Sequence, residues 1–136
     1  MEEKLDLTQI HHINLLVRDI EAAKQSYRDV FNVDFIDEAL PSRGVLTSRF
    51  NVGDAWLVLV QPVAEGLPMR QLREQGEGLF LLSLAVTQTE ACIAAFSPAS
   101  GGLSEVRQGV SGWRVADLQM DRVPPGQLQL TFTQTD

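Results

Sequence analysis

The only two histidines of the chain, His11 and His12, are adjacent, and histidine is the side chain best suited to moving protons or binding transition metals near neutral pH. They lie in residues 9–17, where the alternation of side chains predicts a strand with His12 and Asn14 on one face. Adjacent strand residues point to opposite faces, so we expect that the two histidines cannot chelate one ion together. For His12 two interpretations stay open. It can be a polar residue of a cavity wall whose hydrogen bonds are made within the protein, or it can act as an acid/base or ligand-binding group.

Four further side chains are suited to holding a ligand: Arg49, Trp56, Trp113 and Asp117. A guanidinium suits a carboxylate or phosphate, and an aromatic wall suits an unsaturated ligand. Each also has a structural interpretation, since the two charges can form a salt bridge or a solvated rim, and the tryptophans can simply pack. No serine stands in a nucleophile motif, and the single cysteine, Cys92, lies among apolar residues and is expected on a buried helix face.

A helix is expected directly after the first strand. Asp19 can cap it, because its carboxylate can accept hydrogen bonds from the free N–H groups of the first turn. An apolar stripe at spacings of three and four follows, made of Ile20, Ala23, Tyr27, Val30 and Phe31. Strand-like segments near 33–39, 43–52 and 55–61 complete a β-α-β-β-β unit.

The second half of the chain repeats this order after a linker. The linker, residues 62–77, is rich in Gly and Pro around LPMRQLREQ, which can form about two helical turns. A shift of 69 residues places Leu81 on His12 and Ser83 on Asn14. The later elements are a strand at 78–86, a helix near 88–97, a short strand near 103–108, and the strands GWRVADLQM and QLQLTFTQT. We therefore predict one α+β domain over 1–136, built from two βαβββ repeats at about 9–61 and about 78–135.

Composition restricts the partners. The 136 residues include 11 Lys and Arg against 18 Asp and Glu, a formal net charge of −7. Such a charge repels phosphate backbones and anionic lipid, which argues against nucleic-acid and membrane partners. No segment has the pattern of a signal peptide or the length of a membrane span, so we expect a cytoplasmic protein.

The duplication, the opening IHHINLLVRDIEAAKQSYRDVF, the segment LVLVQPVAEGLPMRQLREQGEG and the closing PPGQLQLTF resemble the vicinal-oxygen-chelate superfamily over residues 9–134. That group includes glyoxalase I, methylmalonyl-CoA epimerase, extradiol dioxygenases and bleomycin-resistance proteins. The resemblance implies a curved mixed sheet with helices on its convex side, a concave ligand cavity and a homodimer. It does not fix the reaction, because members of one fold differ in chemistry.

The resemblance also implies a divalent metal held by one ligand from each of four strands. The matching positions are His12, Val58, Leu81 and Thr131. Valine and leucine offer no lone pair, and a threonine hydroxyl is a poor ligand for a borderline metal. We therefore predict no metal and no other cofactor.

The first hypothesis is thus a metal-independent protein that binds a small organic ligand in its concave cavity. The alternative is a glyoxalase- or epimerase-like lyase or isomerase that uses His12 as acid/base and Arg49 as substrate anchor, and a third is a purely structural module. The expected ligand-binding residues are His12, Asn14, Arg49, Trp56, Val58, Leu81, Ser83, Trp113, Asp117, Gln129 and Thr131.

Overall fold

The computed structural model describes residues 6–88, 106–118 and 127–133. The predicted helix near 88–97, Cys92 and most of the strand near 103–108 lie outside the described residues. The elements of the first half are β1 (Leu7–Leu16), α1 (Ile20–Val30), β2 (Ile36–Leu40), the 3-10 turn η1 (Pro41–Arg43), β3 (Val45–Val52) and β4 (Ala55–Pro62). They are followed by α2 (Leu67–Gln75), β5 (Gly78–Val86), β6 (Arg107–Gln108), the 3-10 turn η2 (Val110–Gly112), β7 (Arg114–Leu118) and β8 (Gln127–Phe132).

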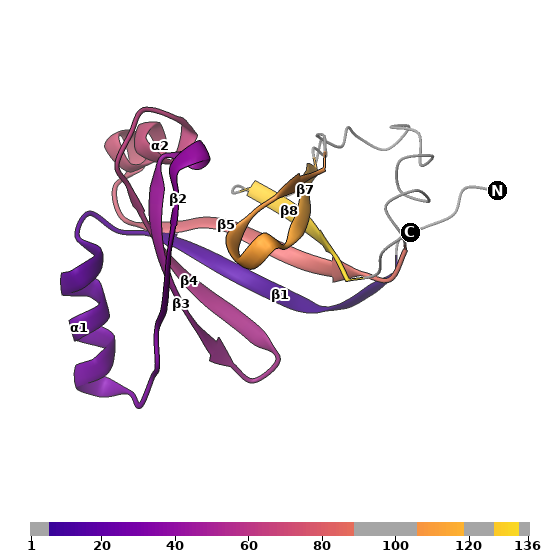
Figure 1. Cartoon of the computed structure of the whole chain (residues 1–136), viewed down its shortest axis with the longest axis horizontal. Helices are drawn as coiled ribbons and strands as arrows, with labels where there is room; N and C mark the ends of the chain where they lie inside the picture. The colour runs from indigo at the N-terminus through magenta and orange to yellow at the C-terminus, as the bar shows by residue number, and fades with distance from the viewer. Residues whose placement is uncertain (1–5, 89–105, 119–126, 134–136) are drawn as a thin grey trace.

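The described strands form one sheet in the order β2-β3-β4-β1-β5-β8-β7-β6 (Figure 1). β1 and β5 pair antiparallel at its centre, and each pairs in parallel with the last strand of its own half, β4 or β8. The remaining pairs are antiparallel hairpins. The strand order is therefore the same on both sides of the β1–β5 seam, which confirms the α+β fold with two repeated halves in a curved mixed sheet.

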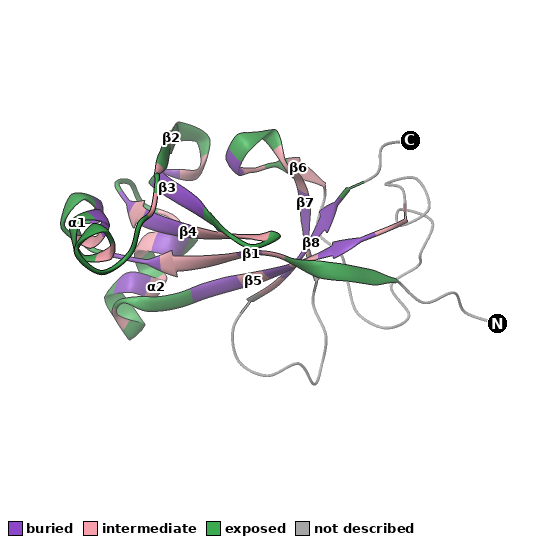
Figure 2. Ribbon diagram, turned by 90° about the horizontal axis from the view of Figure 1, so that it is seen from below, coloured by how far each residue is buried: buried purple, intermediate pink, exposed green. Residues whose placement is uncertain are grey.

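Helix α1 packs against β3 and β4. Its first turn is capped as expected, because Asp19 Oδ1 accepts a hydrogen bond from the backbone N–H of Ala22 at 3.1 Å. Ile20 is buried, and the ring of Tyr27 lies 5.5 Å from that of Phe50 on β3. Figure 2 shows the opposite, exposed side of the helix in green. Ile20, Ala23 and Tyr27 of the predicted stripe therefore dock α1 on the sheet and leave the other face of β3 and β4 to the cavity. Val30 and Phe31, which the pattern also placed in the stripe, are exposed because the chain leaves the sheet where the helix ends.

Helix α2 forms inside the predicted linker. Pro68 stands in its first turn, where the missing N–H needs no partner, and the N–H of Gly76 bonds to the carbonyl of Leu72 at its end. Leu72 packs into the main core cluster, which includes Leu16 and Phe80. The linker is thus part of the core. None of the helices in the described ranges is long and apolar enough to cross a membrane.

Candidate functional site

The two adjacent histidines lie on the same side of β1, contrary to the expectation for a regular strand. Ile10 pairs with Leu84 of β5 and His12 with Ser83, so β1 has one more residue than its partner at this point. Such a β-bulge turns the extra residue, His11, out of the alternation. The two Nδ1 atoms are 2.9 Å apart, and the argument that adjacent histidines must point apart is wrong here.

Trp113, which follows η2, holds both imidazole rings. Its ring is stacked on His12 with centroids 4.8 Å apart and an interplanar angle of 28°. It meets His11 edge to face, at 4.7 Å and 86°. A residue of the second half therefore orients both histidines of the first half, and a role of Trp113 toward a ligand stays a prediction.

Both histidines are held in the neutral form. The pKa of His12 is lowered to about 3, chiefly by burial and also by the nearby His11, while the side chain of Gln129 opposes the shift. Burial also lowers the pKa of His11. At pH 7 the pair consequently has no net charge and acts through its N–H groups and lone pairs.

A cavity of about 40 Å³ opens beside this pair, between the two halves of the sheet. Five of the residues expected from the sequence line it: His12, Asn14, Leu81, Trp113 and Gln129. Most of the remaining wall is apolar or uncharged, from Leu40, Val45, Thr47, Val60, Pro68, Phe80, Gly109, Val110 and Val115. Its volume suffices for a few water molecules, so a larger ligand requires the wall to open.

Two buried amide oxygens face this region without partners. Asn14 Oδ1 and Gln129 Oε1 make no hydrogen bond to any residue in the described part of the chain. Both residues line the cavity. A buried acceptor without a donor is costly, and a ligand or an ordered water that supplies N–H or O–H groups removes that cost.

Arg43 supplies a positive charge at the cavity, and the sequence did not single it out. It ends η1, and Gly44 after it adopts φ 67°, a left-handed turn that lets the chain reverse into β3. Burial lowers the pKa of its guanidinium, Arg107 lowers it further, and Asp117 raises it. Arg43 forms no salt bridge within residues 6–88, 106–118 and 127–133. The only signal in the sequence was a basic residue between Pro41 and a glycine.

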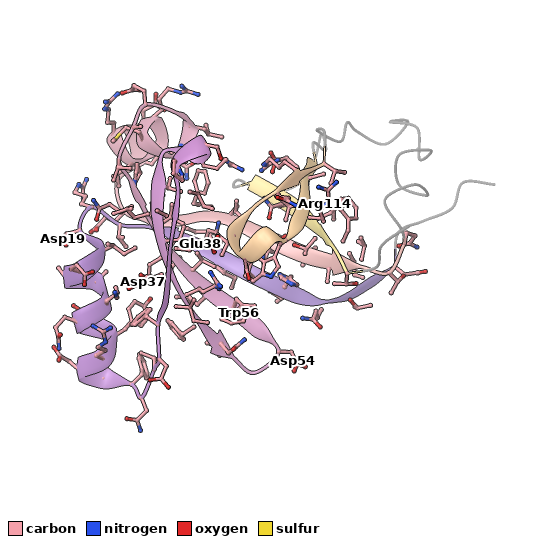
Figure 3. The ribbon with its side chains drawn as sticks, viewed as in Figure 1. Asp19, Asp37, Glu38, Asp54, Trp56 and Arg114 are labelled. Carbon is pink, nitrogen blue, oxygen red and sulfur yellow. The ribbon has the colours of Figure 1, made fainter. Side chains whose placement is uncertain are left out.

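Arg49 lies beside the cavity wall rather than in it. Its Nη1 donates to Glu38 Oε1 of β2 at 2.8 Å, and its guanidinium lies 5.4 Å from the Trp56 ring centroid and 5.8 Å from that of Trp113. The two tryptophans and the carboxylate neutralise and cover this buried cation. Arg49 thus has a carboxylate partner, although its buried Nε makes no hydrogen bond to a described residue, whereas Arg43 has no salt bridge in the same part of the chain. Figure 3 shows Glu38 on β2, on the side of the β6–β7 turn, with Trp56 below it.

The other expected site residues are engaged in contacts within the protein. Ser83 and Thr131 are buried and join their hydroxyls at 2.7 Å, and Val58 is fully buried in the core. Asp117 binds Arg107 of β6 in a two-pronged ion pair with distances of 3.0 and 3.1 Å. These residues build the walls, and their roles toward a ligand stay predictions.

The residues at the four strand positions do not fit a divalent metal. Val58 and Leu81 have no donor atom, and the hydroxyl of Thr131 is engaged by Ser83. Across the described residues there is no group of three or more His, Cys, Asp and Glu side chains that could hold an ion. Of the four metal-ligand positions that the resemblance implies, His12 is therefore the one with a suitable donor atom, and His11 lies unexpectedly beside it.

A family model described as the Glyoxalase/Bleomycin resistance protein/Dioxygenase superfamily matches residues 11–116. No curated protein sequence matches the chain. Methylmalonyl-CoA epimerase from Mycobacterium tuberculosis superposes with a TM-score of 0.84 at 18% identity, covering 98% of this chain and 93% of that one.

Two further solved structures contain ligands. A variant of Streptomyces coelicolor methylmalonyl-CoA epimerase in complex with 2-nitronate-propionyl-CoA has a TM-score of 0.83 and 22% identity, with coverage of 93% and 98%. A methylmalonyl-CoA epimerase in complex with methylmalonyl-CoA and NH4+ has the same score and identity, with coverage of 93% and 95%. At such identities the likeness establishes the fold alone.

Proposed function

We propose, because the chain belongs to the Glyoxalase/Bleomycin resistance protein/Dioxygenase superfamily, that it binds a small organic ligand in this cavity through its own side chains and without a metal at the four strand positions. The observation that carries the proposal is the set of polar groups left without partners at the cavity. Among the described residues, Asn14 offers a buried oxygen without a hydrogen bond, and Arg43 offers a cation without a salt bridge. A cavity with apolar walls and a few convergent polar groups is the usual form of a ligand site.

Arg43 indicates that the ligand has an anionic group. A guanidinium that is half removed from water and lacks a carboxylate gains a charge-assisted, two-pronged hydrogen bond from a carboxylate or phosphate. The rest of the ligand meets Leu81, Val110 and other apolar side chains. The expected ligand is therefore an organic acid or phosphate ester with a compact apolar part, and the CoA thioesters bound by the similar solved structures are suitable first probes.

Proton transfer by His12, the alternative, receives less support. A base whose conjugate acid has a pKa of about 3 accepts a proton poorly near neutral pH. A neutral imidazole fixed by Trp113 is better suited to hydrogen bonding. The binding reading is therefore preferred to an isomerase or lyase that uses His12.

Calorimetry with the untagged protein tests the proposal, with methylmalonyl-CoA as the first probe and a panel of short organic acids and their neutral amides as the second. An acid is expected to bind more tightly than its amide, and Arg43→Gln is expected to reduce that preference at least tenfold. Arg70→Gln, which replaces an exposed arginine of α2 that does not line the cavity, is the control and should leave affinity unchanged. Equal affinity of Arg43→Gln and the parent protein for the acid contradicts the assignment.

Elemental analysis of the same untagged protein, followed by titration with Ni²⁺, Zn²⁺ and Mn²⁺ during thermal unfolding, tests the metal-independent part. We expect no stoichiometric metal and no concentration-dependent rise in Tm. A stoichiometric ion, or ligand binding that disappears with a chelator, rejects this part and favours a metal-dependent enzyme.

A further inference from the structure

The hydrogen bond between His11 and His12 couples the protonation of the two rings. A neutral imidazole has one N–H and one bare nitrogen, so an N–H···N bond between two Nδ1 atoms requires that one ring has its proton on Nδ1 and the other on Nε2. Burial lowers the pKa of both rings, which keeps both neutral. The two histidines must therefore be opposite tautomers.

The surroundings of His12 decide which ring donates. With Nδ1 of His12 occupied by His11, Nε2 is the nitrogen left for Gln129, which lies in register with His12 across Ser83 of β5 and lines the same cavity. Gln129 Oε1 is buried and has no other donor among the described residues. It can only accept, so a proton on His12 Nε2 satisfies it and a bare Nε2 does not.

We infer that His11 is a positioning residue for the cavity: its Nδ1–H donates to His12 Nδ1 and thereby holds the proton of His12 on Nε2, where it donates to Gln129 Oε1 in the cavity wall. The inference deepens the proposed function, on which its statement about the ligand rests. Among the described residues, the buried acceptor at the cavity that is then left to a ligand is Asn14 Oδ1. In the opposite tautomer Nε2 of His12 is bare, and Gln129 Oε1 is also left to a donor of the ligand.

The β-bulge and Trp113 keep this arrangement in place. The bulge at His11 brings its ring to the side of His12, and the stacked and edge contacts of Trp113 restrict rotation of both rings. Among the described residues, the charged side chain over the ring of Trp113 is Arg49, which is itself paired with Glu38. The donor direction is therefore set by neutral hydrogen bonding within the pair and Gln129.

Long-range ¹H–¹⁵N correlation spectra of the untagged, ligand-free protein at pH 7 test the inference directly, because the chemical shifts separate protonated from bare imidazole nitrogens. The chain has 2 histidines, so His11→Asn assigns both ring systems. We expect His12 with a proton on Nε2 and a bare Nδ1, and His11 with a proton on Nδ1. A proton on Nδ1 of His12, or two charged rings, overturns the inference without any variant.

Two substitutions test the role of His11. His11→Asn keeps an N–H donor near the position of Nδ1 and should retain the Nε2–H form of His12. His11→Phe keeps a ring against Trp113 but removes the donor, and should lower the ratio of the Nε2–H to the Nδ1–H form by about fivefold, the value of one net hydrogen bond. If both variants leave His12 unchanged, His11 has no positioning role.

The ligand-free spectra separate this inference from the proposed function. A spectrum with the expected tautomers and no binding of any probe would reject the ligand proposal alone. Binding with the opposite tautomer would reject the inference alone.

Discussion

The carboxylate of Glu38 accepts a hydrogen bond from the backbone N–H of Ser111 at 2.8 Å, which joins β2 of the first half to the β6–β7 turn of the second. The same oxygen accepts from Arg49. This one atom therefore neutralises a buried guanidinium and fastens the turn that carries Val110 and Trp113 over the cavity. Because the cavity is small, ligand entry is expected to require this contact to open.

Glu38→Ala should lower the free energy of unfolding by about 2 kcal/mol, because Arg49 remains buried without its carboxylate. Glu38→Gln should lower it by about half as much, since an amide oxygen can still accept from Ser111. Urea titration measures both. Glu65→Gln, which breaks the exposed pair with Arg73, is the control with an expected loss below about 0.5 kcal/mol. An equal loss in Glu65→Gln and Glu38→Ala would contradict the role of the buried pair.

Ser111 adopts φ 54° and ψ 20°, a left-handed conformation that a non-glycine residue occupies at some energetic cost. Ser111→Gly should relieve that cost and raise stability by about 0.5 kcal/mol after the larger entropy of an unfolded glycine is counted. Ser111→Val should lower stability by about 1 kcal/mol or more, because a β-branched residue fits this region worst. The order Gly, Ser, Val in thermal unfolding is the expected result, and a reversed order would show that the turn relaxes.

Stability should fall on acidification from pH 7.5 to 5 because of His12. Its pKa is about 3 in the folded protein and about 6.5 in the unfolded chain. Below pH 6.5 the unfolded state therefore binds a proton that the folded state does not, and this binding stabilises the unfolded state relative to the folded one. The loss at pH 5 is expected to be roughly 2 kcal/mol, and the full contribution is present above about pH 7.5. The lowered pKa of His11 adds to this fall in the same window, whereas the lowered pKa of Asp37 acts only below its ordinary value. His12→Gln should remove most of the slope in urea titrations, whereas an unchanged slope would assign the effect elsewhere.

The buried hydroxyl pair of Ser83 and Thr131 should behave as a unit. Ser83→Ala or Thr131→Val alone leaves a buried hydroxyl without its partner and should destabilise by about 1–2 kcal/mol. The double variant should be closer to the parent protein than the sum of the two, because no unsatisfied group remains. Strict additivity in the double-mutant cycle would mean that the hydroxyls do not interact in solution.

The repeated fold could be predicted from the sequence because its elements follow from local residue patterns. The period of two on β1, the cap at Asp19 and the apolar stripe after it each follow from the geometry of one element. The match of His12 with Leu81 under the 69-residue shift corresponds to the symmetric strand order about β1 and β5. Once the resemblance gives the four ligand positions, the absence of a metal-binding atom at Val58 and Leu81 follows from the residue types alone.

The site itself depended on contacts between segments far apart in the chain. The period-two rule separated His11 from His12, and only the pairing of β1 with β5 shows the extra residue that brings their Nδ1 atoms together. Arg49 and Arg43 look alike in sequence, yet Glu38 and two tryptophans cover the first while the second faces the cavity. The sequence by itself determined the elements, their order and the missing metal donors, because those depend on near neighbours. The tertiary structure alone decided which charges are paired and which polar groups are left to a ligand, because that depends on what each strand finds across the β1–β5 seam and the β6–β7 turn.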